Sequence, residues 1–301
     1  MRVVVAGASG LIGRAVTRAL HSRGDRVVTL GRDAAKLIGL FPGASAFAWD
    51  PAASAPPMEA IENADAVVNL IGEPIADRPW TADQKTRIRR SRVVATERLA
   101  RAIAAIATPP SVLVQGSAIG FYGPRGDDEV DEQAPAGNDF LASVCRDWEA
   151  AADGLATTRV VLARTGIVLA REGGALPKLI LPFRFFVGGP LGTGRQWMSW
   201  IHIDDVAGLI LHAIDTPQVR GPLNLVGPVP VRNREVAREI GRALGRPAIA
   251  PAPALALRLA LGERVDMLLA SQRIVPRVAR ESGYRFRFSD LGEALRDLTQ
   301  R

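Results

Sequence analysis

A glycine-rich segment near the start of the chain constrains the fold more than any other feature. Gly7–Gly13 reads Gly-Ala-Ser-Gly-Leu-Ile-Gly and follows a short β-branched run, Arg2–Ala6. It leads into Leu11–Arg23, where apolar residues recur at helical spacing. A strand, this glycine pattern and a helix, in that order, are typical of the phosphate-binding turn of a dinucleotide site. The sequence therefore predicts a Rossmann-type fold whose first helix points its N-terminus at a pyrophosphate.

Each glycine of this turn has a geometric role. Gly7 permits the tight turn, Gly10 lets the backbone approach the pyrophosphate, and Gly13 lets the helix pack close to the strand. The free N–H groups at the start of the helix then face the phosphates. The residues expected to bind the cofactor here are Gly7, Ser9, Gly10, Leu11, Ile12 and Gly13.

The end of the second predicted strand indicates which dinucleotide binds. A site for NAD places Asp or Glu at this position to bind the ribose 2′-hydroxyl, whereas this chain has Arg32. An arginine suits the 2′-phosphate of NADP. The adjacent Asp33 is expected to cap the following helix. The sequence thus favours NADP(H) over NAD, on the strength of one side chain.

Short β-rich runs alternate with longer helical patterns through the first half of the chain, which is typical of a parallel α/β sheet. The predicted strands are Arg2–Ala6, Arg26–Leu30, Ala46–Trp49, Ala66–Leu70, Ser111–Gln115 and Arg159–Ala163. The predicted helices are Leu11–Arg23, Thr81–Ala107 and Asp139–Ala152. We therefore expect an α/β fold with a Rossmann-type doubly wound parallel sheet.

The alternation changes after about Thr165, where Gly/Pro-rich segments appear before helical patterns resume near Asp204, Arg232 and Ser289. We expect residues 1–165 to form the NADP-binding domain, completed by a helix and a strand from 204–226. Residues 166–301 are expected to form a smaller, irregular α/β cap. Because ligands bind at the carboxyl ends of the strands, this cap would cover the site and hold the substrate.

Other strand ends offer further cofactor contacts. The third predicted strand ends in Trp-Asp, placed to reach the adenine, and the fourth ends in Asn-Leu-Ile-Gly, where the small residue would admit the cofactor to the backbone. Ordinary strand-end chemistry explains both equally well. The additional cofactor candidates are Trp49, Asp50, Asn69, Leu70, Ile71, Gly72, Ser117 after the fifth strand, and Arg164 after the sixth strand.

Composition excludes several other classes of function. A lone Cys145 and three scattered histidines give no metal-ligand spacing, so we predict no metal site. The net charge of +7 is dispersed along the chain, which argues against nucleic-acid binding. The apolar run Pro251–Ala270 contains charged residues, so we predict no membrane partner. The N-terminus leads from Arg2 into a short strand and a glycine turn instead of a longer apolar stretch, so we predict no targeting signal. A cytoplasmic location is expected.

With these segments identified, the chain resembles the extended short-chain dehydrogenase/reductases, the NAD-dependent epimerase/dehydratase family, over nearly its whole length. The family's stretches are matched at Ala6–Gly13, Val67–Gly72, Ser117–Gly123 and His202–Ala207. Five further stretches resemble an atypical branch of unassigned role: Ser91–Val93, Gly116–Gly123, Trp148–Ala151, Gly192–Trp197 and Ser271–Pro276.

The resemblance implies a catalytic Tyr, a Lys four residues later and a Ser or Thr, yet this chain lacks the Tyr-x-x-x-Lys pattern. It contains only two tyrosines, Tyr122 and Tyr284, and neither has a lysine four residues on. Counting back from Glu149, the family's tyrosine and lysine positions fall near Leu141 and Cys145. The usual proton donor is therefore missing, which general acid–base catalysis would value at roughly 10²–10⁴-fold.

Substitutes for the missing groups are candidates only. Ser117 lies one residue before the family's hydroxyl position, and Tyr122 either protonates a carbonyl or lines the site. Cys145 is expected to be a small buried group and Lys178 a surface lysine. The sequence His202-Ile-Asp-Asp resembles a structural turn in which Asp204 or Asp205 caps a helix.

Arg92 lies in the family position of an asparagine that stands four residues before a threonine, here Thr96, close to the nicotinamide. It shares one predicted helix face with Lys85 and Arg89. That face is either solvated or in contact with cofactor or phosphate. We include Arg92 among the cofactor-binding residues, with an anionic substrate as the alternative ligand.

Two functions fit this pattern. The first is an NADP(H)-dependent oxidoreductase or epimerase-like enzyme that acts on a small polar or anionic molecule with a non-standard proton relay. The second is a non-catalytic NADP(H)-binding redox sensor or partner-binding module, because fold alone does not fix function. The protein is expected to be a monomer, or a homodimer that pairs through the helix Thr81–Ala107.

Overall fold

The computed structural model describes residues 1–300, and its centre is a sheet of seven parallel strands in the order β12-β7-β5-β4-β1-β2-β3. These strands are β1 (Arg2–Ala6), β2 (Arg26–Gly31), β3 (Ser45–Ala48), β4 (Ala66–Asn69), β5 (Val112–Ala118), β7 (Arg159–Thr165) and β12 (Gly221–Leu225). The strand order reverses beside β1, which forms the crevice where such sheets bind ligands.

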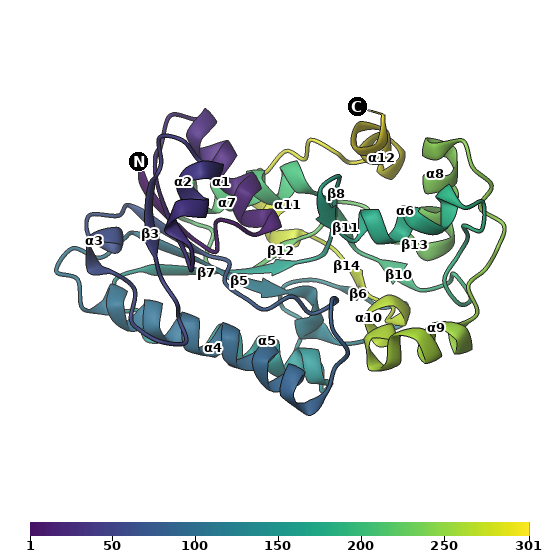
Figure 1. Ribbon diagram of the computed structural model, residues 1–301, viewed down its shortest axis with the longest axis horizontal. Helices are drawn as coiled ribbons and strands as arrows, with labels where there is room; N and C mark the ends of the chain where they lie inside the picture. The colour runs from purple at the N-terminus through teal and green to yellow at the C-terminus, as the bar shows by residue number, and fades with distance from the viewer. Residues whose placement is uncertain (301) are drawn as a thin grey trace.

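Helices cover both faces of this sheet, as Figure 1 shows. They are α1 (Leu11–Ser22), α2 (Ala34–Leu40), α3 (Met58–Ile61), α4 (Ala82–Ala104), α5 (Phe140–Ala150) and α7 (Ile203–Asp215). Successive side chains of β1 face opposite sides, so Val3 and Val5 pack with α1 and α7 while Val4 and Ala6 pack with α4. The predicted doubly wound parallel sheet is confirmed.

Each predicted strand overlaps a strand of the central sheet, and the three predicted helices correspond to α1, α4 and α5. The predicted contribution from 204–226 is present as α7 and the edge strand β12. Its division into a cofactor domain and a cap stays a prediction.

Three small sheets lie outside the central sheet, and the chain around them is irregular. They pair β8 (Ile167–Ala170) with β9 (Gly173–Gly174) and β11 (Trp200–His202), β10 (Trp197–Met198) with β13 (Val231–Arg232), and β6 (Glu129–Val130) with β14 (Arg273–Ile274). The helices here are α6 (Leu176–Arg184), α8 (Asn233–Leu244), α9 (Ala254–Leu261), α10 (Asp266–Leu269), α11 (Arg277–Glu281) and α12 (Leu291–Thr299), with 3-10 turns η1 (Ile119–Tyr122) and η2 (Gly262–Val265). None of the helices within residues 1–300 combines the length and the apolar character needed to cross a membrane.

The start of α7 differs from the expected cap. The N-cap is His202, whose Nδ1 accepts a hydrogen bond from the Asp204 backbone N–H at 3.1 Å. Asp205 instead accepts hydrogen bonds from the backbone N–H groups of Arg287 and Phe288 and from the Tyr284 hydroxyl. Its carboxylate therefore anchors the segment before α12 to the centre of the molecule, and the prediction that an aspartate caps α7 was wrong.

Candidate functional site

The phosphate turn has the geometry that its glycines predict. Gly7 has a φ of +83°, and a Cβ there would lie 2.9 Å from the carbonyl carbon of Leu70, at the end of β4. At Gly13 a Cβ would lie 2.3 Å from the carbonyl oxygen of Gly7, so a side chain would push α1 away from the turn. Both positions therefore require glycine for packing and conformation within the chain.

Gly10 differs from Gly7 and Gly13, because packing within the chain explains less of why this position is a glycine. A Cβ there would meet one heavy atom within 4 Å, the carbonyl oxygen of Gly7 at 3.3 Å. Gly10 is exposed, and as the N-cap of α1 it offers the first turn no side-chain partner. The open space over Gly10 and the helix N-terminus behind it fit a phosphate group that the backbone approaches closely.

Arg32 lies at the end of β2, beside this turn. It is exposed, and its side chain makes no hydrogen bond or ion pair within residues 1–300. Asp33 caps α2, because its Oδ1 accepts a hydrogen bond from the Lys36 backbone N–H at 2.9 Å, as predicted. The guanidinium of Arg32 is therefore free to bind an anion, while the neighbouring carboxylate is occupied.

The two candidates after β3 have different surroundings. Trp49 is only 1% exposed, belongs to the core under α4, and donates its Nε1–H to the carbonyl oxygen of Ser54. Asp50 is exposed and accepts a hydrogen bond from the Ala52 backbone N–H. The Trp49 ring is thus part of the core, and contact of either residue with an adenine stays a prediction.

The end of β4 is held by a buried amide network. Asn69 donates to Thr96 Oγ1 at 3.1 Å and to Gln115 Oε1 at 2.9 Å, and its Oδ1 accepts from the Ile71 backbone N–H. Asn69 is therefore a positioning residue that fixes the strand end. Leu70, Ile71 and Gly72 follow it along the crevice beside β1.

Arg92 stands over this strand end. A Cβ on Gly72 would lie 3.0 Å from its Cζ, and its guanidinium lies 5.0 Å from the Trp148 ring centre. Its Nη1 donates to the carbonyl oxygen of Ile88 in its own helix, and burial lowers the pKa of this guanidinium. Arg92 makes no ion pair within the described chain, so its charge is available to an anionic ligand.

Lys85 and Arg89, which share the helix face of Arg92, have partners inside the chain. Lys85 pairs with Glu263, and Arg89 pairs with Asp147. Arg92 therefore differs from the other two cations on this helix face. Of the three cations, it alone lacks a carboxylate partner among residues 1–300.

Ser117 belongs to a buried network of charged and polar groups. Its hydroxyl donates to Glu149 Oε1 at 2.6 Å, and Glu149 receives two hydrogen bonds from Arg164, at 2.9 and 2.8 Å. Arg164 is 3% exposed and stacks on the Phe121 ring. This bidentate pair satisfies Arg164 within the protein, so cofactor binding by Arg164 stays a prediction that the geometry does not favour.

Tyr122 belongs to the same hydrogen-bond network. Its hydroxyl donates to Asn224 Oδ1 at 2.7 Å and accepts from Arg164 Nη1 at 3.0 Å, and the side chain has no exposed surface. Burial raises the pKa of Tyr122 to about 12. Proton transfer by Tyr122 stays a prediction, and it would require this network to open.

Cys145 lies where the family's lysine was expected. It is a buried, free thiol, and burial raises its pKa to about 12. The thiol is therefore protonated at neutral pH, which is typical of a structural cysteine. Lys178, another substitute considered from sequence, is exposed and pairs with Asp77 at 2.9 Å.

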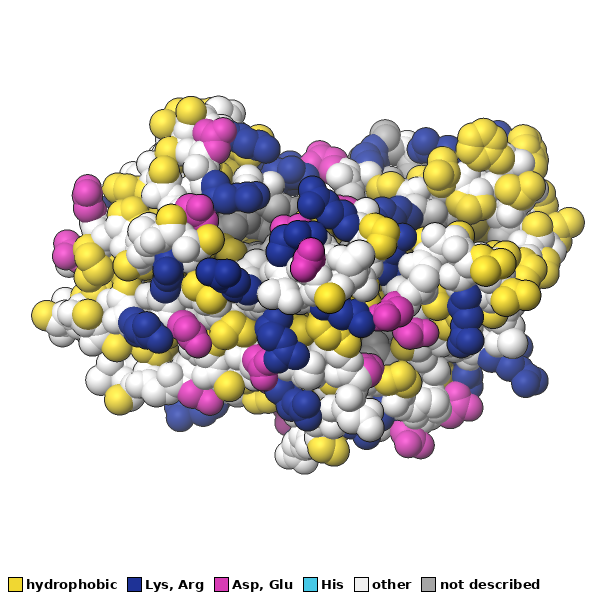
Figure 2. Space-filling view, turned by 60° about the horizontal axis from the view of Figure 1, so that its bottom comes forward, with side chains coloured by type: hydrophobic (Ala, Val, Ile, Leu, Met, Phe, Trp, Pro, Cys, Tyr) yellow, Lys and Arg dark blue, Asp and Glu magenta, His cyan; other side chains and the backbone are white. Residues whose placement is uncertain are grey.

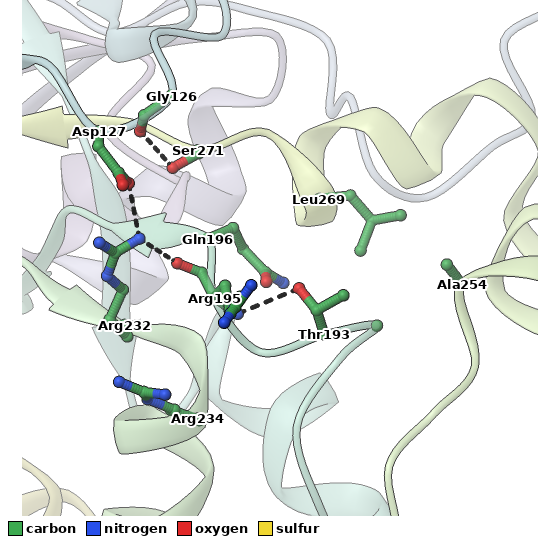
Figure 3. A pocket seen from close by; sticks show the side chains of 11 residues that line it. Gly126, Asp127, Thr193, Arg195, Gln196, Arg232, Arg234, Ala254, Leu269 and Ser271 are labelled. Carbon is green, nitrogen blue, oxygen red and sulfur yellow. Dashed lines mark hydrogen bonds and ion pairs between the residues drawn. The ribbon is translucent and has the colours of Figure 1, made fainter.

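A pocket of about 750 Å³ opens in the irregular C-terminal region, and Figure 3 shows its lining. Gly126 and Asp127 in its wall follow η1, which leaves the carboxyl end of β5, the edge of the sheet that also carries the phosphate turn. The other lining residues come from 192–196, from the start of α8, and from Ala254, Leu269 and Ser271.

Arginines dominate the charge of this pocket. Arg232 donates to Asp127 Oδ1 at 2.7 Å and stacks on Trp197, whereas the side chains of Arg195 and Arg234 make no hydrogen bond or ion pair within residues 1–300. Two free cations beside one neutralised pair suit a ligand with negative charge. The sequence did not indicate Arg232 and Arg234, because only the fold brings the start of α8 to the loop of Arg195.

A parallel sheet with this strand order, an open glycine turn at its switch point and a free arginine after β2 define a Rossmann-type dinucleotide-binding protein. Comparison with known proteins agrees. The model for the NAD dependent epimerase/dehydratase family matches residues 3–225, and the chain belongs to this family. A second model, described as a domain of unknown function (DUF1731), matches residues 252–298.

Relatives match along the whole chain. The chain is 41% identical to epimerase family protein SDR39U1 of Bos taurus over 307 residues, covering 99% of each chain. It is 40% identical to an epimerase family protein of Mycobacterium leprae, covering 99% of this chain and 96% of the relative. The crystal structure of human epimerase family protein SDR39U1 with NADPH is similar with a TM-score of 0.90 and 38% identity, covering 100% of this chain and 99% of the human one.

Proposed function

We propose that this chain binds NADP(H) at the carboxyl edge of its central sheet and uses it as an oxidoreductase or epimerase-like enzyme on a small anionic molecule. The observation that carries the proposal is the open turn at Gly10 with the unpaired Arg32 beside it. A backbone cradle and a free guanidinium fit the pyrophosphate and the 2′-phosphate of this nucleotide. The human relative that contains NADPH supports the choice of cofactor.

The strand order sets the direction of the bound nucleotide in this proposal. Arg32 follows β2, so the adenosine half extends toward β2 and β3, and the nicotinamide half extends toward β4 and β5. When bound, NADP(H) would supply hydride chemistry at that second position. Gly72 and Arg92 lie on this side, where Arg92 would hold an anionic group of cofactor or substrate.

The pocket lined by Arg195, Arg232 and Arg234 supports an anionic substrate. Two of its lining residues, Gly126 and Asp127, follow β5 and η1, so in this proposal the pocket would lie on the nicotinamide side of the site. The two unpaired arginines would bind carboxylate or phosphate groups and orient the molecule toward the cofactor. Ser117 and Tyr122 remain the predicted proton-transfer residues of this reaction.

A second candidate function, an NADP(H)-dependent sensor without catalysis, is favoured by one observation. The hydroxyl groups of Ser117 and Tyr122 are both buried and bonded, and the thiol of Cys145 is buried and protonated. A site without a free proton donor still binds nucleotide. Such a sensor requires different partner affinities in the NADP⁺ and NADPH states.

Calorimetric titration followed by turnover assays separates these outcomes. We expect NADPH to bind at least about tenfold more tightly than NADH, because only NADPH has the 2′-phosphate. Oxidation of NADPH in the presence of small carbonyl compounds bearing carboxylate or phosphate would establish the enzyme. Tight NADPH binding with no turnover across such a panel would favour the sensor, and equal affinity for NADPH and NADH would overturn the cofactor assignment.

A further inference from the structure

Large apolar side chains are exposed together at the end of the molecule that carries the irregular C-terminal region (Figure 2). We call this set the apolar patch; it consists of Leu181, Phe185, Phe186, Val187, Ile249, Leu255 and Leu259. Phe185 is 70% exposed, and Leu259 is 81% exposed. Single exposed apolar residues are ordinary, but a group of this kind marks an interaction surface.

The backbone brings the parts of the apolar patch together. Residues 188–192, which follow the exposed phenylalanines, pair with 250–252, which separate Ile249 from α9. The bonds run from Ala250 N to Gly188 O at 3.1 Å and from Ala252 N to Pro190 O at 2.9 Å. Arg246 stacks on the Phe186 ring at 4.2 Å, so the loop before Ile249 also contacts the end of α6.

The helix α9 is apolar yet contains no buried residue. Its sequence is Ala-Leu-Ala-Leu-Arg-Leu-Ala-Leu, and Leu255 and Leu259 lie one turn apart on its exposed side. Short helices depend on packing of an apolar face for stability. This face of α9 has no cover among residues 1–300.

Phe186 occupies a position where the backbone favours glycine. Its φ is +62°, in the left-handed region, and it comes two residues after Arg184, the last residue of α6, in a helix-ending turn closed by a bond from Val187 N to Pro182 O at 3.1 Å. A bulky residue there is strained, while glycine is not. Helix termination therefore does not explain Phe186, and its ring points to a role at the surface.

The unpaired charges in the two segments that carry the apolar patch are positive, and Glu263, which follows the second segment, pairs with Lys85. Residues 176–192 and 246–262 contain Lys178, Arg184, Arg246 and Arg258 but no Asp or Glu. Lys178 pairs with Asp77, whereas Arg184 and Arg258 make no ion pair within residues 1–300. An apolar surface whose unpaired flanking charges are arginines is complementary to an apolar layer with an anionic surface.

We propose that the apolar patch docks the protein on an anionic lipid surface, with the phenylalanines and leucines in the interfacial layer and the arginines against the head groups. A second copy fits less well, because two such patches would bring like charges together. Protein hot spots fill pockets, whereas these side chains project from α6, from the turn that follows it, from a loop and from the side of α9. The prediction of no membrane partner was based on the absence of a segment that spans a bilayer. Docking through the apolar patch does not require such a segment.

Co-sedimentation of the full chain with lipid vesicles tests the proposal. We expect binding to vesicles of phosphatidylcholine with phosphatidylglycerol and little binding to phosphatidylcholine alone. F186G removes one anchor and relieves the left-handed strain, so it should weaken binding about tenfold while melting at the same temperature as the wild type or higher. Reversing the charges of Arg184 and Arg258 to Glu should weaken it about tenfold or more.

The control is I38S, which removes an exposed apolar side chain from α2, outside the apolar patch, and should bind vesicles as the wild type does. The proposal is overturned if the wild type does not bind the anionic vesicles, or if F186G binds them equally well. Light scattering that shows self-association lost in F186G would assign the patch to a second copy instead. Binding to an acidic amphipathic peptide but not to vesicles would assign it to a protein partner.

Discussion

Two arginines at the carboxyl edge of the sheet illustrate how surroundings decide the role of a side chain. Arg32 is exposed and has no partner within residues 1–300, whereas Arg164 is buried in a bidentate pair with Glu149. In the sequence, each arginine follows a predicted strand. Only Arg32 can bind a ligand without first losing a protein contact.

Replacing Arg32 tests the specificity for the 2′-phosphate. R32Q should weaken NADPH binding by about 10–100-fold, because a hydrogen bond to a charged group contributes about 1.5–3 kcal/mol. NADH lacks the phosphate, so its affinity should stay the same. Calorimetry on both nucleotides measures this, with R90Q on the exposed side of α4 as the control. Equal losses for NADPH and NADH would show that Arg32 does not read the phosphate.

Glu132 gives a pH-dependent prediction. Its Oε1 accepts hydrogen bonds from the backbone N–H groups of Asn224 and Val278, but Oε2 is buried with no partner, and burial raises the pKa of this carboxyl. The unfolded chain therefore loses this proton at a lower pH than the folded protein. The contribution of Glu132 to the free energy of unfolding should be largest below the ordinary pKa of Glu and fall as pH rises through the folded pKa.

The variant E132Q stays neutral at every pH. It should melt at a higher temperature than the wild type at pH 7, and the difference should shrink toward pH 4. Thermal melts of both proteins from pH 4 to 8 measure this. A difference that is constant with pH would mean that Glu132 titrates as it does in the unfolded chain.

At the scale of elements, the turn between β1 and α1 contains one glycine that packing requires and another that a ligand would require. A Cβ at Gly13 would lie 2.3 Å from the Gly7 carbonyl oxygen, but a Cβ at Gly10 would lie 3.3 Å from the same atom. Adding a methyl group at Gly13 and adding one at Gly10 should therefore have different effects. One position is closed by the protein, and the other is open to a ligand.

G13A should destabilise the fold by about 1–3 kcal/mol, because the added atom overpacks the contact between strand and helix. G10A should leave the melting temperature nearly unchanged yet weaken NADPH about tenfold or more, since it displaces a backbone hydrogen bond to a charged phosphate. Thermal melts and calorimetry on both variants form one matched experiment. A stable G10A that binds NADPH as the wild type does would remove the phosphate from this turn.

The pair of Glu149 on α5 and Arg164 on β7 links a helix to the sheet. E149Q leaves the guanidinium buried without its opposite charge and should lower the free energy of unfolding by about 3–5 kcal/mol. E97Q, which removes an exposed pair with Arg101 at 3.6 Å, should change it by less than about 1 kcal/mol. Urea unfolding of both variants measures the contrast. Similar small changes would mean that the buried pair does not hold α5 against the sheet.

At the scale of the whole molecule, local patterns predicted the sheet and the turn but not the assembly around them. The strands and helices of the first half follow apolar periodicity, and Asp33 caps α2 as expected. The helix α6 was not predicted, because Pro177 and Pro182 interrupt its pattern. Trp49 was one candidate for contact with the adenine; its ring lies in the core, and the contact stays a prediction.

The remaining site features depend on distant contacts. Arg232 meets Asp127 across 105 positions of the chain, and Tyr122 meets Asn224 across 102. No local spacing indicates such pairs, because loops and crossovers decide which residues meet. For the same reason, the sequence left Ser117 and Tyr122 as open candidates, and the fold shows both with buried partners.

A crystal structure of this protein grown with NADPH tests the central claim most directly. The account predicts the pyrophosphate against the backbone at Gly10 and the first turn of α1, with the 2′-phosphate in hydrogen-bond contact with Arg32 and the nicotinamide on the side of β4 and β5. Nucleotide bound away from this turn, or a 2′-phosphate without a contact to Arg32, would contradict it.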